Sequence, residues 1–185
     1  MSPSSEEIAV PPNKIMVKVK PSPILKFGDW HTSCTIGRNG TIAGADKREG
    51  DGYTPLGTYP LRPGFALTHR FADWPEVTHF AFTQPTPYDI WDNDPFSPTY
   101  NQQTRLDPDS GHEERLLRPD GLYDVIIPIG FNDDPPLAGR GSAIFLHIAT
   151  SNMAPTAGCI AVPRDRISGL VRRLTPDTLI EILSD

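Results

Sequence analysis

Two residues in the last quarter of the chain, His147 and Cys159, carry the side chains that nucleophilic catalysis requires. They lie in the stretch FLHIATSNMAPTAGCIAV, residues 145–162, where one apolar run breaks at the histidine and another begins at the cysteine. A thiol attacks a carbonyl carbon as the thiolate, so it needs a base or a positive neighbour that lowers its pKa from about 8.5. An imidazole placed beside the sulfur can serve as that base.

The same two residues could instead be ordinary core residues. A free cysteine is among the most buried residue types and behaves as a small hydrophobe, and residue frequencies alone favour this alternative. The residues just before the cysteine favour catalysis. The segment Thr-Ala-Gly places Cys159 at a corner between a turn and a strand, where Gly158 lets the backbone come close to a reacting carbonyl.

Two predicted strands would have to position this pair. Residues 142–149 and 159–162 are short apolar runs of the β type, so His147 lies near the end of one strand and Cys159 opens the next. Antiparallel pairing of the two strands, through a loop of about ten residues, would bring the imidazole beside the sulfur.

Most of the remaining pattern also indicates β structure. Convincing helical spacing of apolar residues occurs only in residues 163–174, directly after the cysteine strand. The 21 prolines and 15 glycines, beside 37% hydrophobic residues, indicate many turns and favour a mainly β fold over a helical bundle. Further strands are predicted in residues 14–20, 24–37, 77–84, 123–132 and 177–183, with another after a tight loop in 48–61.

The predicted organisation is a flexible segment, residues 1–12, followed by a single domain over residues 13–185. Residues 85–120 form a long polar excursion with few aliphatic side chains, and loops of that length are usually functional or disordered. Its aromatic residues could wall a substrate cleft or fill a small core of the excursion itself, and the sequence leaves both open. These aromatic residues are Tyr88, Trp91, Phe96 and Tyr100.

Composition argues against several kinds of partner and site. The net charge of −6, with dispersed basic residues, argues against nucleic acid binding. No apolar run reaches about 18 residues and no signal peptide is visible, so we expect no transmembrane segment. Cys34 is expected in the core, and two cysteines do not decide the redox compartment. No metal site is expected, because the spacing of the other histidines does not suit metal ligands; these are His31, His69, His79 and His112.

The stretch IFLHIA…PTAGCIAV, preceded by YDVIIPIGFNDDP…GRGSA, resembles the catalytic domain of the L,D-transpeptidase (YkuD-like) family. The upstream segment ADKREGDGYTPLGTYPL is similar to the one ahead of that family's active site, so the resemblance extends over residues 35–185. It implies a sandwich-like or barrel-like assembly of β-sheets, with a long loop excursion and a short helix after the cysteine.

The resemblance also implies roles for individual residues. Cys159 matches the family's nucleophile and His147 its base, while Gly158 and Thr156 match the glycine and hydroxyl of its cysteine motif. Backbone N–H groups at Gly158 and Cys159 would hold the oxyanion. Arg140 is expected to bind a substrate carboxylate, and Trp91 to contact the substrate. The chain departs from the family pattern at Ala157, Ala161 and Ile148, which indicates a divergent branch.

The activity implied is cleavage of a peptidoglycan stem peptide through a thioester on Cys159, followed by transfer to an amine of a second stem. The alternatives are an L,D-carboxypeptidase or cross-link hydrolase on the same scaffold, and a non-catalytic peptidoglycan-binding domain. No cofactor is implied. Stem peptides are the expected partners of a monomer, a carbapenem the expected inhibitor, and the periplasm or cell envelope, with a role in cell shape, the expected setting.

Overall fold

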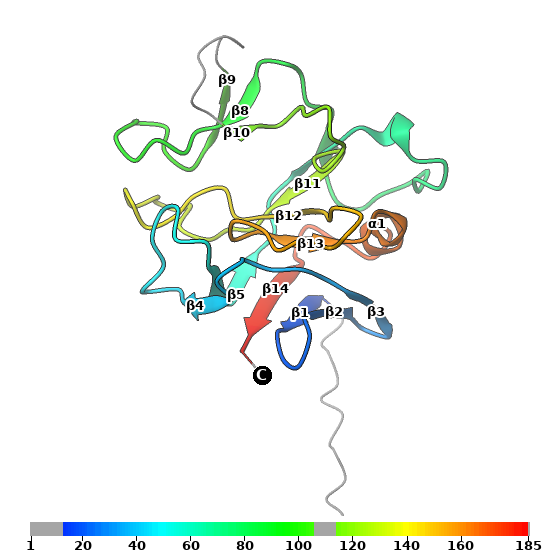
Figure 1. Ribbon diagram of the computed structural model, residues 1–185. Helices are drawn as coiled ribbons and strands as arrows, with labels where there is room; N and C mark the ends of the chain where they lie inside the picture. Colours follow the sequence, from blue (N-terminus) through cyan, green and yellow to red (C-terminus); the bar gives the residue numbers. More distant parts are fainter. Residues whose placement is uncertain (1–12, 106–113, 185) are drawn as a thin grey trace, which may run out of the picture.

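The computed structural model describes residues 13–105 and 114–184, and three β-sheets account for most of their regular structure (Figure 1). Strands hold 35% of the described residues and helices 7%, which confirms the mainly β prediction. The segment expected to be flexible, residues 1–12, lies outside the described residues, as does His112.

The first sheet has six strands in the order β3-β2-β1-β14-β5-β4. Its middle strand pair, β1 and β14, is parallel, and β14 pairs antiparallel with β5 on its other side. The strands are β1 (Lys14–Lys18), β2 (Ile24–Phe27), β3 (Trp30–Ser33), β4 (Thr41–Ala43), β5 (Thr54–Pro60) and β14 (Leu179–Leu183).

The second sheet carries the two candidate catalytic residues and has the strand order β13-β12-β11-β6-β7. Its strands are β6 (Gly64–Ala66), β7 (Phe82–Thr83), β11 (Val125–Pro128), β12 (Phe145–Ile148) and β13 (Ile160–Val162). A 3-10 helix, η1 (Thr68–Arg70), follows β6, and the helix α1 (Arg164–Val171) follows β13 with Pro163 as its N-terminal flanking residue. The helix predicted after the cysteine is therefore confirmed.

The predicted strand at 77–84 is mostly wrong, because only Phe82–Thr83 pairs with a neighbour. The two phenylalanines of this segment pack through ring contacts instead of along a strand ladder. Phe82 lies edge-on to Trp74 with ring centroids 5.3 Å apart, and Phe80 lies 5.4 Å from Phe82. Val77, which precedes them, remains exposed.

The polar excursion forms a small third sheet with the order β10-β8-β9. Figure 1 places this sheet at the end of the molecule opposite β1, β2 and β3, with the second sheet between them. Its strands are β8 (Asp89–Trp91), β9 (Gln103–Arg105) and β10 (Glu114–Arg115). The excursion therefore has regular structure of its own on both sides of residues 106–113, which are not described.

The main core lies between the first and second sheets. Side chains on the opposite face of the second sheet are therefore free to form a functional site. Even-numbered residues of β12 and β13, such as Leu146 and Ile160, are fully buried in this core together with Ile15 and Ile180 of the first sheet. Side chains alternate between the two faces of a strand. The odd-numbered residues of β12 and β13 therefore face the other way, toward the small third sheet.

Among the described residues, no helix is long and apolar enough to cross a membrane.

Candidate active site

The register of β12 and β13 brings His147 and Cys159 to one face of the second sheet. Leu146 stands opposite Ile160 and His147 opposite Ala161. Cys159 precedes Ala161 by two residues, so both side chains share the face on which His147 lies. The two candidate catalytic residues are therefore diagonal neighbours on adjacent strands.

The strands that carry the pair are parallel, so the predicted antiparallel pairing is wrong. A parallel connection must return along the full length of the strand, which usually requires a dozen or more residues. Here the strand β12 spans only about 13 Å, and residues 149–159 can cover that distance. Isolated bridges of Gly37 with Thr156 and of Thr35 with Ala161 hold the returning segment in place.

Cys159 is buried, with 8% of its surface exposed, and two backbone groups contact its sulfur. The thiol donates to the carbonyl oxygen of Ala143 at 3.3 Å, and the N–H of Phe145 donates to the sulfur at 3.4 Å. Burial raises the pKa of Cys159 to about 12, opposed by the Phe145 N–H and the charge of Lys47. The resting residue is a neutral thiol.

His147 is buried to the same degree, with 7% exposed, and its ring orientation is fixed by the backbone. The ring nitrogen Nδ1 lies 2.8 Å from the carbonyl oxygen of Ile148. A carbonyl oxygen can only accept, so Nδ1 carries the proton and Nε2 keeps the lone pair that a general base needs. Burial lowers the pKa of His147 to about 4, so the imidazole is neutral at pH 7. The group that orients the imidazole is thus a backbone carbonyl, that of Ile148.

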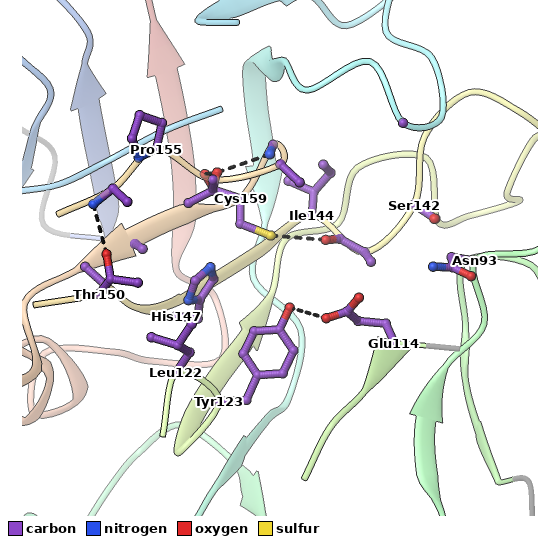
Figure 2. Close-up of a pocket in the computed structure, with 18 of the residues that line it drawn as sticks. Asn93, Glu114, Leu122, Tyr123, Ser142, Ile144, His147, Thr150, Pro155 and Cys159 are labelled. Atoms are coloured by element: carbon purple, nitrogen blue, oxygen red, sulfur yellow. Dashed lines mark hydrogen bonds between the residues drawn. The ribbon is translucent and has the colours of Figure 1, made fainter. Parts of the chain in front are cut away.

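Both side chains open into one cavity of about 350 Å³ (Figure 2). In Figure 2 the sulfur of Cys159 and the ring of His147 lie at the same side of this cavity, with Tyr123 next to them and Glu114 facing them. The cavity is also lined by Gly158 and Thr156. Its volume falls within the range of small-molecule and peptide side-chain sites.

The turn before Cys159 is built by the hydroxyl of Thr156. This hydroxyl donates to the carbonyl oxygen of Cys159 at 2.7 Å and accepts the N–H of Gly158 at 3.1 Å. Thr156 therefore shapes the turn, and the Gly158 N–H that was expected to hold an oxyanion already has a partner. Gly158 has φ +145, and a Cβ there would lie 2.9 Å from the carbonyl oxygen of Tyr53.

A polar cluster from the excursion and from the turn that precedes β11 forms the wall opposite the cysteine. The hydroxyl of Tyr123 donates to Glu114 at 2.6 Å, and Arg118 donates to the same carboxylate oxygen at 3.2 Å. The ring of Tyr123 lies edge-on to that of His147, with centroids 5.3 Å apart. Burial and the nearby negative charges raise the pKa of Tyr123, so its phenol remains a hydrogen-bond donor.

Arg140 and Trp91, the two other predicted substrate contacts, are not among the residues that line this cavity. Trp91 lies behind the site, where its ring is 5.1 Å from that of Phe145 and its Nε1 donates to Asn101. Arg140 is half-buried in the loop ahead of β12, and its Nε has no hydrogen-bond partner. Of the predicted site residues, Cys159, His147, Gly158 and Thr156 line the cavity. Arg140 and Trp91 lie outside it.

Several residues that line the cavity were not named as candidates from the sequence. Lys47 and Glu49 line the cavity from the segment ahead of β5, Glu114 from the excursion, and Tyr123 from the turn that precedes β11. Lys47, Glu49 and Tyr123 lie in stretches that carry the family resemblance, and Glu114 lies outside them. In residues 13–105 and 114–184, no three His, Cys, Asp or Glu side chains gather in a way that could hold a metal ion.

Comparison with known proteins agrees with this geometry. A family model described as YkuD, L,D-transpeptidase catalytic domain, matches residues 15–182. No curated protein matched the chain.

Proposed function

Because the chain belongs to the L,D-transpeptidase catalytic domain family, we propose that it is a cysteine-dependent L,D-transpeptidase that cross-links two peptidoglycan stem peptides through a thioester on Cys159. The observation that carries the proposal is the single cavity into which β12 and β13 direct an imidazole and a thiol. A buried nucleophile, a base with a fixed tautomer and a cavity beside them are the parts that acyl transfer needs.

In the first step the sulfur of Cys159 attacks the carbonyl carbon of the donor stem, and its proton passes to Nε2 of His147. The pKa values of about 12 and about 4 keep both groups neutral at rest, so the proton moves as the sulfur attacks and not before. His147 then gives that proton to the leaving amine, and the acyl group remains on the sulfur.

Backbone N–H groups at the turn would stabilise the oxyanion of the tetrahedral intermediate. The N–H of Cys159 itself is the first donor that we assign. The N–H of Gly158 can join it only by exchanging the hydroxyl of Thr156 for the oxyanion. One such donor contributes about 3 to 4 kcal/mol in the transition state.

In the second step the amine of another stem attacks the thioester, and His147 accepts the amine's proton. A second cavity of about 1020 Å³ adjoins the first and shares Leu122, Ala149 and Thr150 with it. This space supports a transferase over a hydrolase, because water as the acceptor needs no binding site of its own.

Peptidoglycan is the substrate that the family implies, and its members are typically associated with the cell envelope. We propose that this protein works in the periplasm or cell envelope, with cross-linking that maintains cell shape as its role and a monomer as its working form. A carbapenem is expected to acylate Cys159, because its strained carbonyl can accept the thiol in the same cavity.

The test compares purified wild-type protein with Cys159→Ala and with Cys34→Ala as the matched control. Cys34 is buried in the main core, away from the cavity, so its removal should leave turnover intact. We expect cross-linked dimers from tetrapeptide stems by mass spectrometry with wild type and Cys34→Ala, and none with Cys159→Ala. Shortened monomers without dimers would identify a hydrolase. Absence of both turnover and carbapenem acylation in folded protein would indicate a binding domain.

A further inference from the structure

The carbonyl group of Ala143, which accepts the thiol proton of Cys159, belongs to a residue in an unusual backbone conformation. Ala143 has φ +53, in the left-handed region that non-glycine residues rarely adopt. Such a residue persists only when its surroundings hold it there. The position of the thiol's acceptor therefore depends on whatever holds Ala143.

Asn101 of the excursion is the side chain that holds Ala143. Its Oδ1 accepts the N–H of Ala143 at 3.0 Å, and its Nδ2 donates to the carbonyl oxygens of Phe131 at 3.1 Å and Asn132 at 2.7 Å. Asn101 is 4% exposed, so these contacts replace water completely. They tie the excursion to both ends of the loop that precedes β12.

Trp91 completes the arrangement from the same small sheet. Its Nε1 donates to Oδ1 of Asn101 at 2.9 Å, which fills the remaining acceptor position of the amide. Its ring packs edge-on against Phe145, whose N–H is the second hydrogen-bond partner of the Cys159 sulfur. Both backbone groups that contact the sulfur are thus supported by this pair of residues, one by Asn101 and the other by Trp91.

We propose that Asn101, with Trp91 bound to its amide, is a positioning residue for the nucleophile: it fixes the Ala143 carbonyl, and through it the orientation of the Cys159 thiol. The proposal is tested by thiol alkylation and by turnover of stem peptides, and only the turnover measurement rests on the proposed function. The arrangement gives the excursion a role at the site that does not require contact with substrate.

The neighbouring residue strengthens the same connection without reaching the sulfur. The hydroxyl of Tyr100 accepts the N–H of Gly141 at 3.1 Å and donates to Glu49, which also accepts the hydroxyl of Ser142 at 2.7 Å. Tyr100 and Asn101 together hold the backbone from Gly141 to Ala143 in place through these hydrogen bonds. Of the two, only Asn101 contacts the residue whose carbonyl meets the thiol.

The test measures the thiol directly, by the rate at which iodoacetamide alkylates Cys159 across a pH series. The variants are Asn101→Ala and Trp91→Phe, with Gln103→Ala as a control that removes a different hydrogen bond of the same sheet, the one to Asp89. Peptide-resolved mass spectrometry also follows Cys34, whose burial reports on the integrity of the fold.

In Asn101→Ala we expect the pH midpoint for Cys159 alkylation to fall by about one unit, because the lost acceptor contacted only the protonated thiol. Turnover of stem peptides should fall about tenfold or more in kcat, with KM changed less than about twofold, because the nucleophile is no longer held for attack. Trp91→Phe should lower the pH midpoint and kcat as well, but by less. Gln103→Ala should match wild type in both. Cys34 should stay protected throughout.

An unchanged pH midpoint for Cys159 alkylation in folded Asn101→Ala would overturn the proposal. So would an increase in the reactivity of both Cys34 and Cys159 in both variants, because Asn101 and Trp91 would then support the fold in general and not the thiol in particular. If Asn101→Ala does not fold, Trp91→Phe decides alone, because it keeps an aromatic ring against Phe145. If wild type shows no acyl transfer, the proposed function fails while the alkylation result still decides this inference.

Discussion

At the scale of single residues, the site is a neutral acid–base pair that burial holds away from its ordinary titration range. Desolvation disfavours the charged form of each side chain, so the histidine loses basicity and the cysteine loses acidity. The resting protein therefore avoids a thiolate that oxidants could attack. In the mechanism that we propose, the ion pair forms only during the reaction, when substrate groups replace missing solvation.

The buried imidazole should make the protein sensitive to acid. His147 has a folded pKa of about 4, below the ordinary value of 6.5. Between these two pH values the unfolded chain binds a proton at His147 that the folded protein does not bind. The free energy of unfolding therefore decreases as the pH falls from 6.5 to 4. A shift of this size corresponds to about 3 kcal/mol. Urea unfolding of wild type at pH 7, 5.5 and 4.5 should show this loss.

The variant His147→Gln should remove that part of the pH dependence, because glutamine does not titrate. His31→Gln is the matched control, since His31 is exposed on β3, and it should follow wild type. An identical acid dependence in His147→Gln and wild type would show that other groups cause the loss.

At the scale of elements, the alternation of β12 and β13 divides structural from chemical roles. One face of these strands supplies the main core, and the opposite face supplies the cavity and the contacts that Phe145 makes with the excursion. A shift of register by one residue would exchange the two faces. The turn that starts β13 is therefore as important to the site as the residues that line it.

Gly158→Ala should disturb that turn more than its small change in volume indicates. Alanine at φ +145 is strained, and its Cβ would lie 2.9 Å from a backbone oxygen that cannot move freely. We expect the free energy of unfolding to fall by about 1–3 kcal/mol and acyl transfer to be lost. Gly139→Ala, at φ +74 but with open space around its Cβ, is the control for backbone strain alone. Equal losses in the two variants would exclude the contact with Tyr53 as the cause.

The elements show what the sequence could predict and what it could not. Short apolar runs rich in Val, Ile and Phe predicted β11, β12 and β13, and the spacing after Pro163 predicted α1, because both signals are local. The parallel pairing of β12 with β13 depends on bridges from Thr35 and Gly37, distant in sequence, so a two-strand argument favoured a hairpin instead. The family motif predicted Cys159 and His147 as the catalytic pair, and the fold places both on one face of the second sheet. Asn101 has no local pattern, because its partners are backbone groups that the fold brings together.

At the scale of the whole molecule, a buried carboxylate joins three parts of the chain near the second cavity. Asp124, at the start of β11, accepts Arg70 of η1 at 2.6 Å and Arg164 of α1 at 2.7 Å. The carboxylate is buried while the two guanidinium groups are 39% and 44% exposed, so solvent screens part of the attraction.

Asp124→Asn should lower the free energy of unfolding by about 1–3 kcal/mol, because a neutral amide leaves the two arginines without their shared counter-charge. Asp133→Asn is the matched control, since it breaks a pair with Arg62 nearer the surface and should cost less than about 1 kcal/mol. Urea unfolding at pH 7 measures both variants. A larger loss for Asp133→Asn would contradict the role assigned to Asp124.

The place of β14 in the six-stranded sheet has a consequence for the order in which the chain can fold. β14 lies between β1 and β5, so the sheet remains in two separate parts until Leu179–Leu183 is available to join them. During synthesis at the ribosome, the hairpins β1–β2 and β2–β3 can form early because their contacts are local. The main core cannot close until β14 has left the exit tunnel, and until then the edges of β1 and β5 are open to unwanted pairing. Closure of the six-stranded sheet is therefore a late step of folding, because it joins strands from the two ends of the described residues.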